Sequence, residues 1–355
     1  MDIYKKILLI LILLLVLIIC YRFYKNYIKL SEIFSNKETF VFDTKDNEYE
    51  VVSNSDITTS VQNSNHDNIK LSQMVIKSAY NCAFTGTYMN LDMLKYVLSR
   101  GCRYLDFEVF YLKENDVFIP VVACSNDSTF GTIKSENYIL LDDIFITINS
   151  NAFSFTSPNR SDPLIINLRI KSNDSNVYAS VAKSIDYHLK SKLFDGKIHN
   201  DTLMKDVKGK IILSVDKTIH RNYKDFNDCN DPDKKCIKLK HFVNLESGGE
   251  LLNIFKYNEI FEQESISILI NNDNINTNVN HMKLVVPDTF NDNIKNPNLS
   301  DLILKYGVQI SPFCFYKNDL QLNNYEEFFN DNYASFIPLG VALSYFKKLK
   351  ELDSD

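Results

Sequence analysis

The sequence lacks several features that would place it in other classes of protein. It has no tryptophan, and it has only six histidines and seven cysteines among 355 residues. The odd number of cysteines, without a regular spacing, argues against the disulfide framework of a small secreted domain. The spacing of Cys229 and Cys236 does not match the usual zinc-binding patterns. There is also no excess of positive charge, since the net charge is −6, and this argues against nucleic acid as a partner.

What remains is a chain with enough apolar material for a sizeable core. Hydrophobic residues make up 45% of it, which suits one large domain or two smaller ones. A (β/α)₈ barrel of roughly 250 residues would fit once the N-terminus is set aside. The Lys-, Asn-, Ile- and Tyr-rich composition is common in AT-rich genomes, so a large DNA virus or a protist is a candidate source.

The N-terminus contains one long hydrophobic run. Residues 7–20 are uninterrupted and apolar, and tyrosines with lysines or arginines flank them on both sides. Residues 3–24 are therefore predicted to form a transmembrane helix within an anchor of residues 1–30. A cleaved signal peptide is the alternative, although the small residues of a cleavage site are missing. More basic residues follow the run than precede it, which predicts a single-pass protein whose main domain is cytosolic.

A polar segment, residues 31–68, follows this run. It is rich in Asn, Asp, Ser, Thr and Glu, so it is predicted to be a stalk between the membrane and the folded domain. Strands packed on the outside of that domain are the alternative.

The stretch from residue 71 to residue 110 organises the rest of the chain. A short apolar strand at 73–78 is followed by a polar turn, a helical pattern at 91–98 and a strand at 104–109. This order is typical of a βα unit that feeds a parallel sheet. The pattern continues with expected strands and helices and predicts an α/β fold, a (β/α)₈ TIM-type barrel. The further strands are expected at 117–123, 164–168, 210–215, 241–245, 283–286 and 308–315, and the helices at 140–149, 177–193, 250–257 and 299–306.

Two groups of residues in this stretch resemble the X box of the phosphoinositide-specific phospholipase C family. The first comprises Leu71, Ser72, Ile76, Ser78, Asn81, Thr85 and Gly86, and the second Gly101, Cys102, Arg103, Asp106 and Glu108. The residues from Asn296-Pro297 to Pro338 are similar to the Y box. The resemblance implies a phospholipase C-like phosphodiesterase barrel over residues 69–345. It divides into an X-like part (69–217), a loop (218–240) and a Y-like part (241–345), followed by a charged tail (346–355).

The resemblance also implies a site that has changed. Family members use calcium to activate a hydroxyl and two histidines to stabilise charge and protonate the leaving group. The two histidine positions hold Tyr80 and Ser125 here. Asn81, Asp106 and Glu108 match calcium ligands of the family, in a degenerate form. The altered positions are Arg169, where a fourth ligand glutamate is expected, and Ser214 and Asp216, where phosphate-binding lysines are expected.

Two interpretations of this site stay open. In the first interpretation, Asp106 and Glu108 form a buried ion pair with Arg169, and no cofactor binds. In the second, the residual site still binds calcium. The first favours a membrane-anchored, catalytically inactive binding or structural protein, with a phosphoinositide or a protein as partner. The alternatives are an active phosphodiesterase that uses Asp106 or Glu108 as general base, and a lipid-headgroup binder without turnover.

Overall fold

The computed structural model describes residues 59–125, 132–226, 237–263, 281–287 and 295–352. The chain divides into two units, Met1–Glu50 and Val51–Asp355, and all the described residues belong to the second. The predicted transmembrane helix and most of the predicted stalk lie outside them. Among the described residues, no helix is long and apolar enough to cross a membrane.

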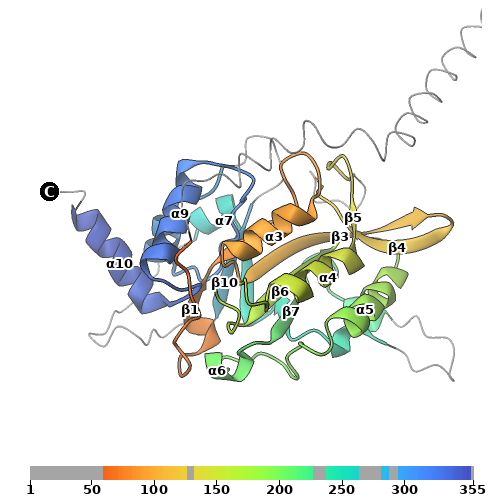
Figure 1. Cartoon of the computed structure of the whole chain (residues 1–355), viewed down its shortest axis with the longest axis horizontal. Helices are drawn as coiled ribbons and strands as arrows, with labels where there is room; N and C mark the ends of the chain where they lie inside the picture. Colours follow the sequence, from red (N-terminus) through yellow and green to blue (C-terminus); the bar gives the residue numbers. More distant parts are fainter. Residues whose placement is uncertain (1–58, 126–131, 227–236, 264–280, 288–294, 353–355) are drawn as a thin grey trace, which may run out of the picture. The chain divides into compact units, whose positions relative to one another are not determined.

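The core of the second unit is a ring of parallel strands, which isolated bridges close. Figure 1 labels β3, β6, β7 and β10 among these strands. Seven strands follow one another around the ring, in the order β2 (Ser78–Ala79), β3 (Tyr104–Glu114), β6 (Leu164–Ile170), β7 (Ile211–Asp216), β8 (Leu245–Ser247), β9 (Leu252–Lys256) and β10 (Met282–Val286). Residues 310–313 complete the ring, because Ile310 bridges Leu284 of β10 and Phe313 bridges Ala79 of β2. β1 (Met74–Ile76) precedes β2 and pairs antiparallel with β11 (Phe336–Pro338). The predicted α/β barrel, with eight parallel segments around the ring, is therefore present.

Helices cover the outer face of the ring between successive strands. α3 (Leu91–Ser99) packs on α4 (Leu141–Asn151), and α4 packs on α5 (Asn176–His188). The start of α3 follows from its sequence, because the side chain of Asn90 accepts a hydrogen bond from the backbone of Asp92. The other helices are α6 (Met204–Val207), α7 (Tyr257–Phe261), α8 (Leu299–Tyr306), α9 (Leu320–Asp331) and α10 (Leu339–Leu352).

The strand after β3 is not one of the parallel strands of the ring. β4 (Val117–Val122) runs antiparallel to β3, from the pair Val109–Val122 to the pair Glu114–Val117. The turn residues Asn115 and Asp116 both have positive φ, 48° and 64°, as a tight hairpin turn requires. β5 (Ile139–Leu140) then pairs antiparallel with β4. The expected strand at 117–123 is correct as a strand, but it extends β3 outward as a hairpin.

The largest difference from prediction lies around β8 and β9. The strand expected at 241–245 begins at Leu245, after a 3₁₀ turn at Leu239–His241, and the helix expected at 250–257 is wrong because β9 occupies most of that range. Only residues 248–251 join β8 to β9. Gly248 makes this turn possible, because its φ is 77° and a Cβ atom there would lie 2.4 Å from Cγ2 of Thr218. No helix therefore covers the ring between these two strands.

Residues 59–68 pack against the barrel at the end where its strands begin. The side chain of Val61 is buried, Gln62 bridges Ala334, and the backbone N–H and hydroxyl of Ser64 donate to Asp162 at 2.8 and 2.9 Å. The end of the predicted stalk thus belongs to the folded unit. At the other end of the chain, α10 continues to Leu352, so the predicted tail at 346–355 begins inside a helix.

Candidate functional site

The register between β3 and β6 brings the predicted site residues together at the end of the ring where the strands finish. Asp106 pairs with Asn167, and Glu108 pairs with Arg169. Residues two apart on a strand share a face, so all four side chains lie on the inner face. This end of the barrel is called the mouth below. Asn81, from the loop after β2, reaches the same place.

The guanidinium group of Arg169 is the centre of the mouth. Its Nε donates to Asp106 Oδ1 at 3.0 Å, its Nη1 to Glu108 Oε1 at 2.7 Å, and its Nη2 to Asp106 Oδ2 at 2.6 Å and Asn81 Oδ1 at 2.8 Å. Burial lowers the pKa of Arg169, but the negative charges of Asp106 and Glu108 outweigh burial and raise it above its usual value. Arg169 is therefore a permanent cation among the three predicted calcium ligands.

Asn81 is held in a conformation that suits its amide. Its φ is 43°, in the left-handed region that asparagine tolerates better than most residues. Its side-chain Nδ2 donates to Cys124 Sγ at 3.3 Å while its Oδ1 accepts from Arg169. Both ends of the amide are thus engaged within the mouth.

Tyr80, which the sequence predicts at the position of the family's first histidine, packs on the arginine. The Cζ atom of Arg169 lies 4.5 Å from the centre of the Tyr80 ring, within the range of a cation–π interaction. Burial raises the pKa of Tyr80 well above its ordinary value, so the phenol stays neutral. It stabilises a cation rather than supplying one.

Ser125, which the sequence predicts at the second histidine position, bonds to the other carboxylate oxygen of Glu108. Its backbone N–H and its hydroxyl donate to Glu108 Oε2 at 2.7 and 2.8 Å, and Lys171 Nζ lies 3.4 Å from Glu108 Oε1. Burial raises the pKa of Glu108, but Arg169, Lys171 and the two bonds from Ser125 outweigh it, so the pKa lies below its usual value. Glu108 is therefore an anchored carboxylate with no tendency to accept a proton near neutral pH.

The remaining altered positions line the neighbouring strand. Ser214 is fully buried, and its hydroxyl has no hydrogen-bond partner among the described residues. Asp216 accepts from the backbone N–H and the hydroxyl of Thr218 at 2.8 and 2.6 Å. Burial nevertheless raises the pKa of Asp216 above its ordinary value. Neither residue supplies the positive charge that the family pattern has here.

Sequence reasoning missed two lysines that the structure brings to the mouth. Lys171 follows β6, and Lys256 ends β9. Burial, and then the charge of Arg169, lowers the pKa of Lys256, and burial also lowers the pKa of Lys171. A signal was present for Lys171, because a charged residue directly after a buried strand of a barrel points to the catalytic end. No such signal existed for Lys256, because β9 was expected to be a helix.

The histidines do not replace the missing pair. His241 lies in the 3₁₀ turn before β8, and His281 precedes β10 at the opposite end of the ring from the mouth. His220 follows β7 and lies near the rim, where its Nε2 is 2.9 Å from the carbonyl oxygen of Ser172.

These residues do not fit a calcium ion. Calcium takes six to eight oxygen ligands, whereas the oxygens of Asn81, Asp106 and Glu108 converge here on a guanidinium group. Among the described residues there is no group of three or more His, Cys, Asp or Glu side chains that could hold a metal ion. The described geometry thus corresponds to the buried ion pair, one of the two interpretations of the sequence.

Comparison with known families shows which proteins this part of the chain is similar to. Residues 68–217 match the family model for "Phosphatidylinositol-specific phospholipase C, X domain". This segment is therefore similar to the X domain of that family. The predicted resemblance is confirmed, and the matched segment contains every altered position named above, from Tyr80 to Asp216.

Solved structures with the same fold include PLC21 from S. officinalis and PLC21 from L. pealei. Their TM-scores are 0.57 and 0.55 and their identities 15% and 14%, over 79% and 77% of this chain. The aligned part is 38% of each of those proteins. A calcium-dependent phosphoinositol-specific phospholipase C from Pseudomonas sp aligns over 80% of this chain and all of its own, with 10% identity and a TM-score of 0.44. No curated protein matches the chain.

Proposed function

We propose that this protein is a phospholipase C-like barrel without phosphodiesterase activity, which acts as a membrane-anchored binding or structural protein. The observation that carries the proposal is the position of Arg169. Its guanidinium group takes the place that a calcium ion would need between Asn81, Asp106 and Glu108. A side chain that is tied by four short hydrogen bonds does not leave this place for a metal ion at low cost.

The loss of proton-transfer groups supports the same proposal. A general acid or base contributes about 10²–10⁴-fold to a rate, and it needs a pKa near the working pH. The neutral phenol of Tyr80 has a raised pKa, and Ser125 is committed to Glu108. Glu108 itself has a lowered pKa and is bonded on both oxygens, so it is a poor general base.

The carboxylates of the mouth have cationic partners without a metal ion. Three cations, Arg169, Lys171 and Lys256, face three carboxylates, those of Asp106, Glu108 and Asp216. A family site that lacks its metal would instead leave carboxylates unpaired. A metal ion is therefore not needed to balance their negative charge.

The test is a turnover assay on the full chain purified in a nonionic detergent. Phosphatidylinositol in mixed micelles is supplied with calcium or with a chelator, and an active phospholipase C serves as the positive control. We expect no release of inositol phosphate and no thermal stabilisation by calcium. Calcium-dependent cleavage by the unmodified chain, removed by Asp106→Asn, would establish the active-phosphodiesterase alternative in place of this proposal.

A series of replacements tests whether the metal position decides the outcome. Tyr80→His combined with Ser125→His restores both histidines but leaves Arg169 in place, so we expect neither calcium binding nor cleavage. Adding Arg169→Glu replaces the cation with a ligand, and we expect calcium to raise the melting temperature of this triple variant. Recovery of cleavage in the double variant would show that Arg169 does not block the site.

Lys171 and Lys256 favour a second candidate function, the binding of a phosphoinositide headgroup without turnover. Both ammonium groups lie at the mouth, and their lowered pKa values show that burial there is costly for them. A phosphate group between them would relieve that cost. Flotation with vesicles that contain phosphatidylinositol phosphates tests this, and the double variant Lys171→Gln, Lys256→Gln should abolish binding.

Membrane anchoring by residues 3–24, with the barrel on the cytosolic side, is proposed from the sequence alone. The full chain should resist carbonate extraction, and protease added to sealed vesicles should show on which side the barrel lies. Appearance of a shortened mature chain that begins near residue 24 would instead identify a signal peptide.

A further inference from the structure

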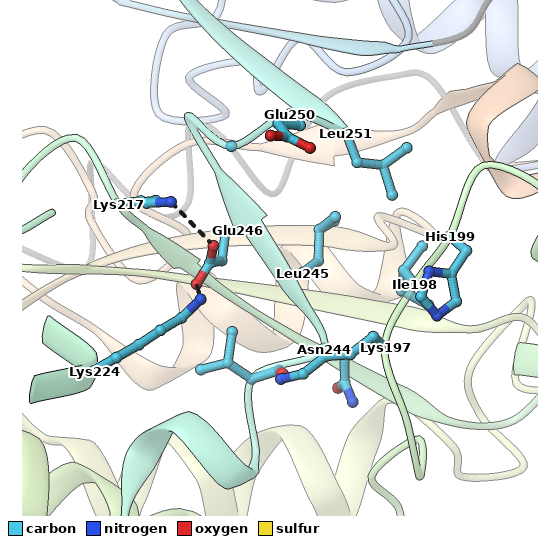
Figure 2. A pocket seen from close by; sticks show the side chains of 12 residues that line it. Lys197, Ile198, His199, Lys217, Lys224, Asn244, Leu245, Glu246, Glu250 and Leu251 are labelled. Carbon is cyan, nitrogen blue, oxygen red and sulfur yellow. Dashed lines mark hydrogen bonds and ion pairs between the residues drawn. The ribbon is translucent and has the colours of Figure 1, made fainter. Parts of the chain in front are cut away.

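A cavity lies on the outer wall of the barrel, away from the mouth, where the helix between β8 and β9 is missing. Its volume is about 500 Å³, within the range of small-molecule sites. Four basic and two acidic side chains line it, together with an apolar surface from β8 and its neighbours. The charged or titratable residues are Lys197, His199, Lys217, Lys224, Glu246 and Glu250 (Figure 2).

Glu246 cannot neutralise the lysines around it. It projects outward from β8, because the neighbouring Ser247 points into the ring and bonds to Asn167. Lys224 Nζ lies 2.6 Å from its Oε1, and Lys217 Nζ lies 3.6 Å from its Oε2. One carboxylate is thus shared by two ammonium groups.

Lys197 adds a third positive charge from the other side of the cavity. Figure 2 shows Lys197 and His199 on one side and the group of Lys217, Glu246 and Lys224 on the other. Among the described residues, the Lys197 ammonium donates to the backbone carbonyls of Val243 and Lys240 and pairs with no carboxylate. Burial, and then the charge of Lys224, lowers its pKa, whereas the charge of Glu246 raises it.

We infer that this cavity binds a phosphate monoester group, placed between Lys197 and Lys224. A doubly charged phosphate accepts several charge-assisted hydrogen bonds at once, as lysines on two sides of a cavity can provide. The apolar surface of Leu245 and Leu251 would hold the uncharged part of the ligand. The site is independent of the mouth, so it does not depend on whether the barrel has phosphodiesterase activity.

The ligand can come from two sources with the same chemistry, and two probes separate them. One arm titrates the full chain in detergent with fructose 1,6-bisphosphate, followed by calorimetry. The other arm titrates the full chain in the same detergent with mixed micelles that contain phosphatidic acid, and micelles with phosphatidylcholine alone serve as the control. Fructose serves as the uncharged control for the first arm.

Variants decide whether binding occurs in this cavity. Lys197→Gln and Lys224→Gln should each weaken binding of the successful probe by about tenfold, the loss expected for a charged hydrogen bond. Glu246→Gln should tighten it several-fold, because it removes the competing negative charge. Lys183→Gln, on the exposed face of α5, should leave it unchanged.

The lysine variants should bind more weakly and Glu246→Gln more tightly. A folding defect cannot explain this result, because a damaged protein does not bind more tightly. Binding in the first arm alone supports a soluble phosphorylated ligand, and binding in the second arm alone supports a lipid headgroup. Failure of both probes, or binding that none of Lys197→Gln, Lys224→Gln and Glu246→Gln alters, would overturn the inference.

Discussion

Replacement of Arg169 by methionine tests the electrostatic account of the mouth most directly. Methionine keeps much of the length of the side chain but removes five hydrogen bonds of 2.6–3.1 Å to three residues. Glu108 keeps Lys171 and Ser125 as partners. Asp106, which is fully buried, keeps the amide of Asn167 at 2.9 Å but loses the arginine with which it forms its ion pair.

The expected cost follows from this uncompensated charge. Breaking a buried ion pair by removal of one partner costs about 3–5 kcal/mol of unfolding free energy. At about 2–4 °C per kcal/mol, this lowers the melting temperature by about 6–20 °C. Arg160→Met is the matched control, because Arg160 is exposed and stacks on Phe155, and a surface change of this kind costs about 0.5 kcal/mol or less.

Urea denaturation and calorimetry of the full chain in detergent measure these values, with and without calcium. Calcium should stabilise Arg169→Met, by about 2.7 kcal/mol when its concentration is a hundred times the dissociation constant, and should not stabilise the wild type. Adding Asp106→Asn to Arg169→Met should recover part of the lost stability by removing the unpaired charge. The reasoning is refuted if Arg169→Met is as stable as Arg160→Met, or if calcium stabilises the wild type.

Three further predictions concern stability. The lowered pKa of Glu108 contributes stability that is present above its unfolded pKa of about 4.3 and is lost as the pH falls through the folded value. In urea denaturation, Glu108→Gln should therefore reduce the loss of unfolding free energy at acidic pH. Burial raises the pKa of Asp162 to about 6, so the folded state holds its proton more tightly than the unfolded state does. The free energy of unfolding should therefore fall as the pH rises from about 4 to 6. Asp162→Asn should remove that slope, and an unaltered slope would refute this assignment. Gly248→Ala should cost at least about 1 kcal/mol more than Gly209→Ala in chemical denaturation, because both glycines have positive φ but only Gly248 has an atom within 2.4 Å of the new Cβ; equal losses would contradict this.

The sequence predicted the first half of the fold well, because local pattern and long-range order agree there. The buried runs that became β3, β6 and β7 are bounded by turns, and Asn90 marks the start of α3. The second half was less predictable. The stretch 250–257 has an apolar spacing that suits a helix as well as a short strand, and only pairing of β9 with β10 decides between them.

The candidate site was predictable in its members but not in its arrangement. The resemblance identified Asn81, Asp106, Glu108 and Arg169 as neighbours, and the structure brings them together. The sequence could not decide between an ion pair and a residual calcium site, because that depends on the register that places Glu108 beside Arg169. Lys256 was out of reach for the same reason, since its position follows from a strand that was expected to be a helix.

Contacts between the first and the last described parts of the barrel join residues that are far apart in the chain. Residues 60 and 330, and residues 78 and 325, are separated by 270 and 247 positions, and β1 pairs with β11 near the C-terminus. Contacts of this kind slow folding, because a long loop must be ordered before they form. During synthesis from the N-terminus, β1 and β2 must therefore wait, with unpaired edges, until almost the whole chain has left the ribosome. A chain that ends before Phe336 keeps the complete segment that matches the X domain but loses the strand that pairs with β1, so it should be prone to aggregation and degradation.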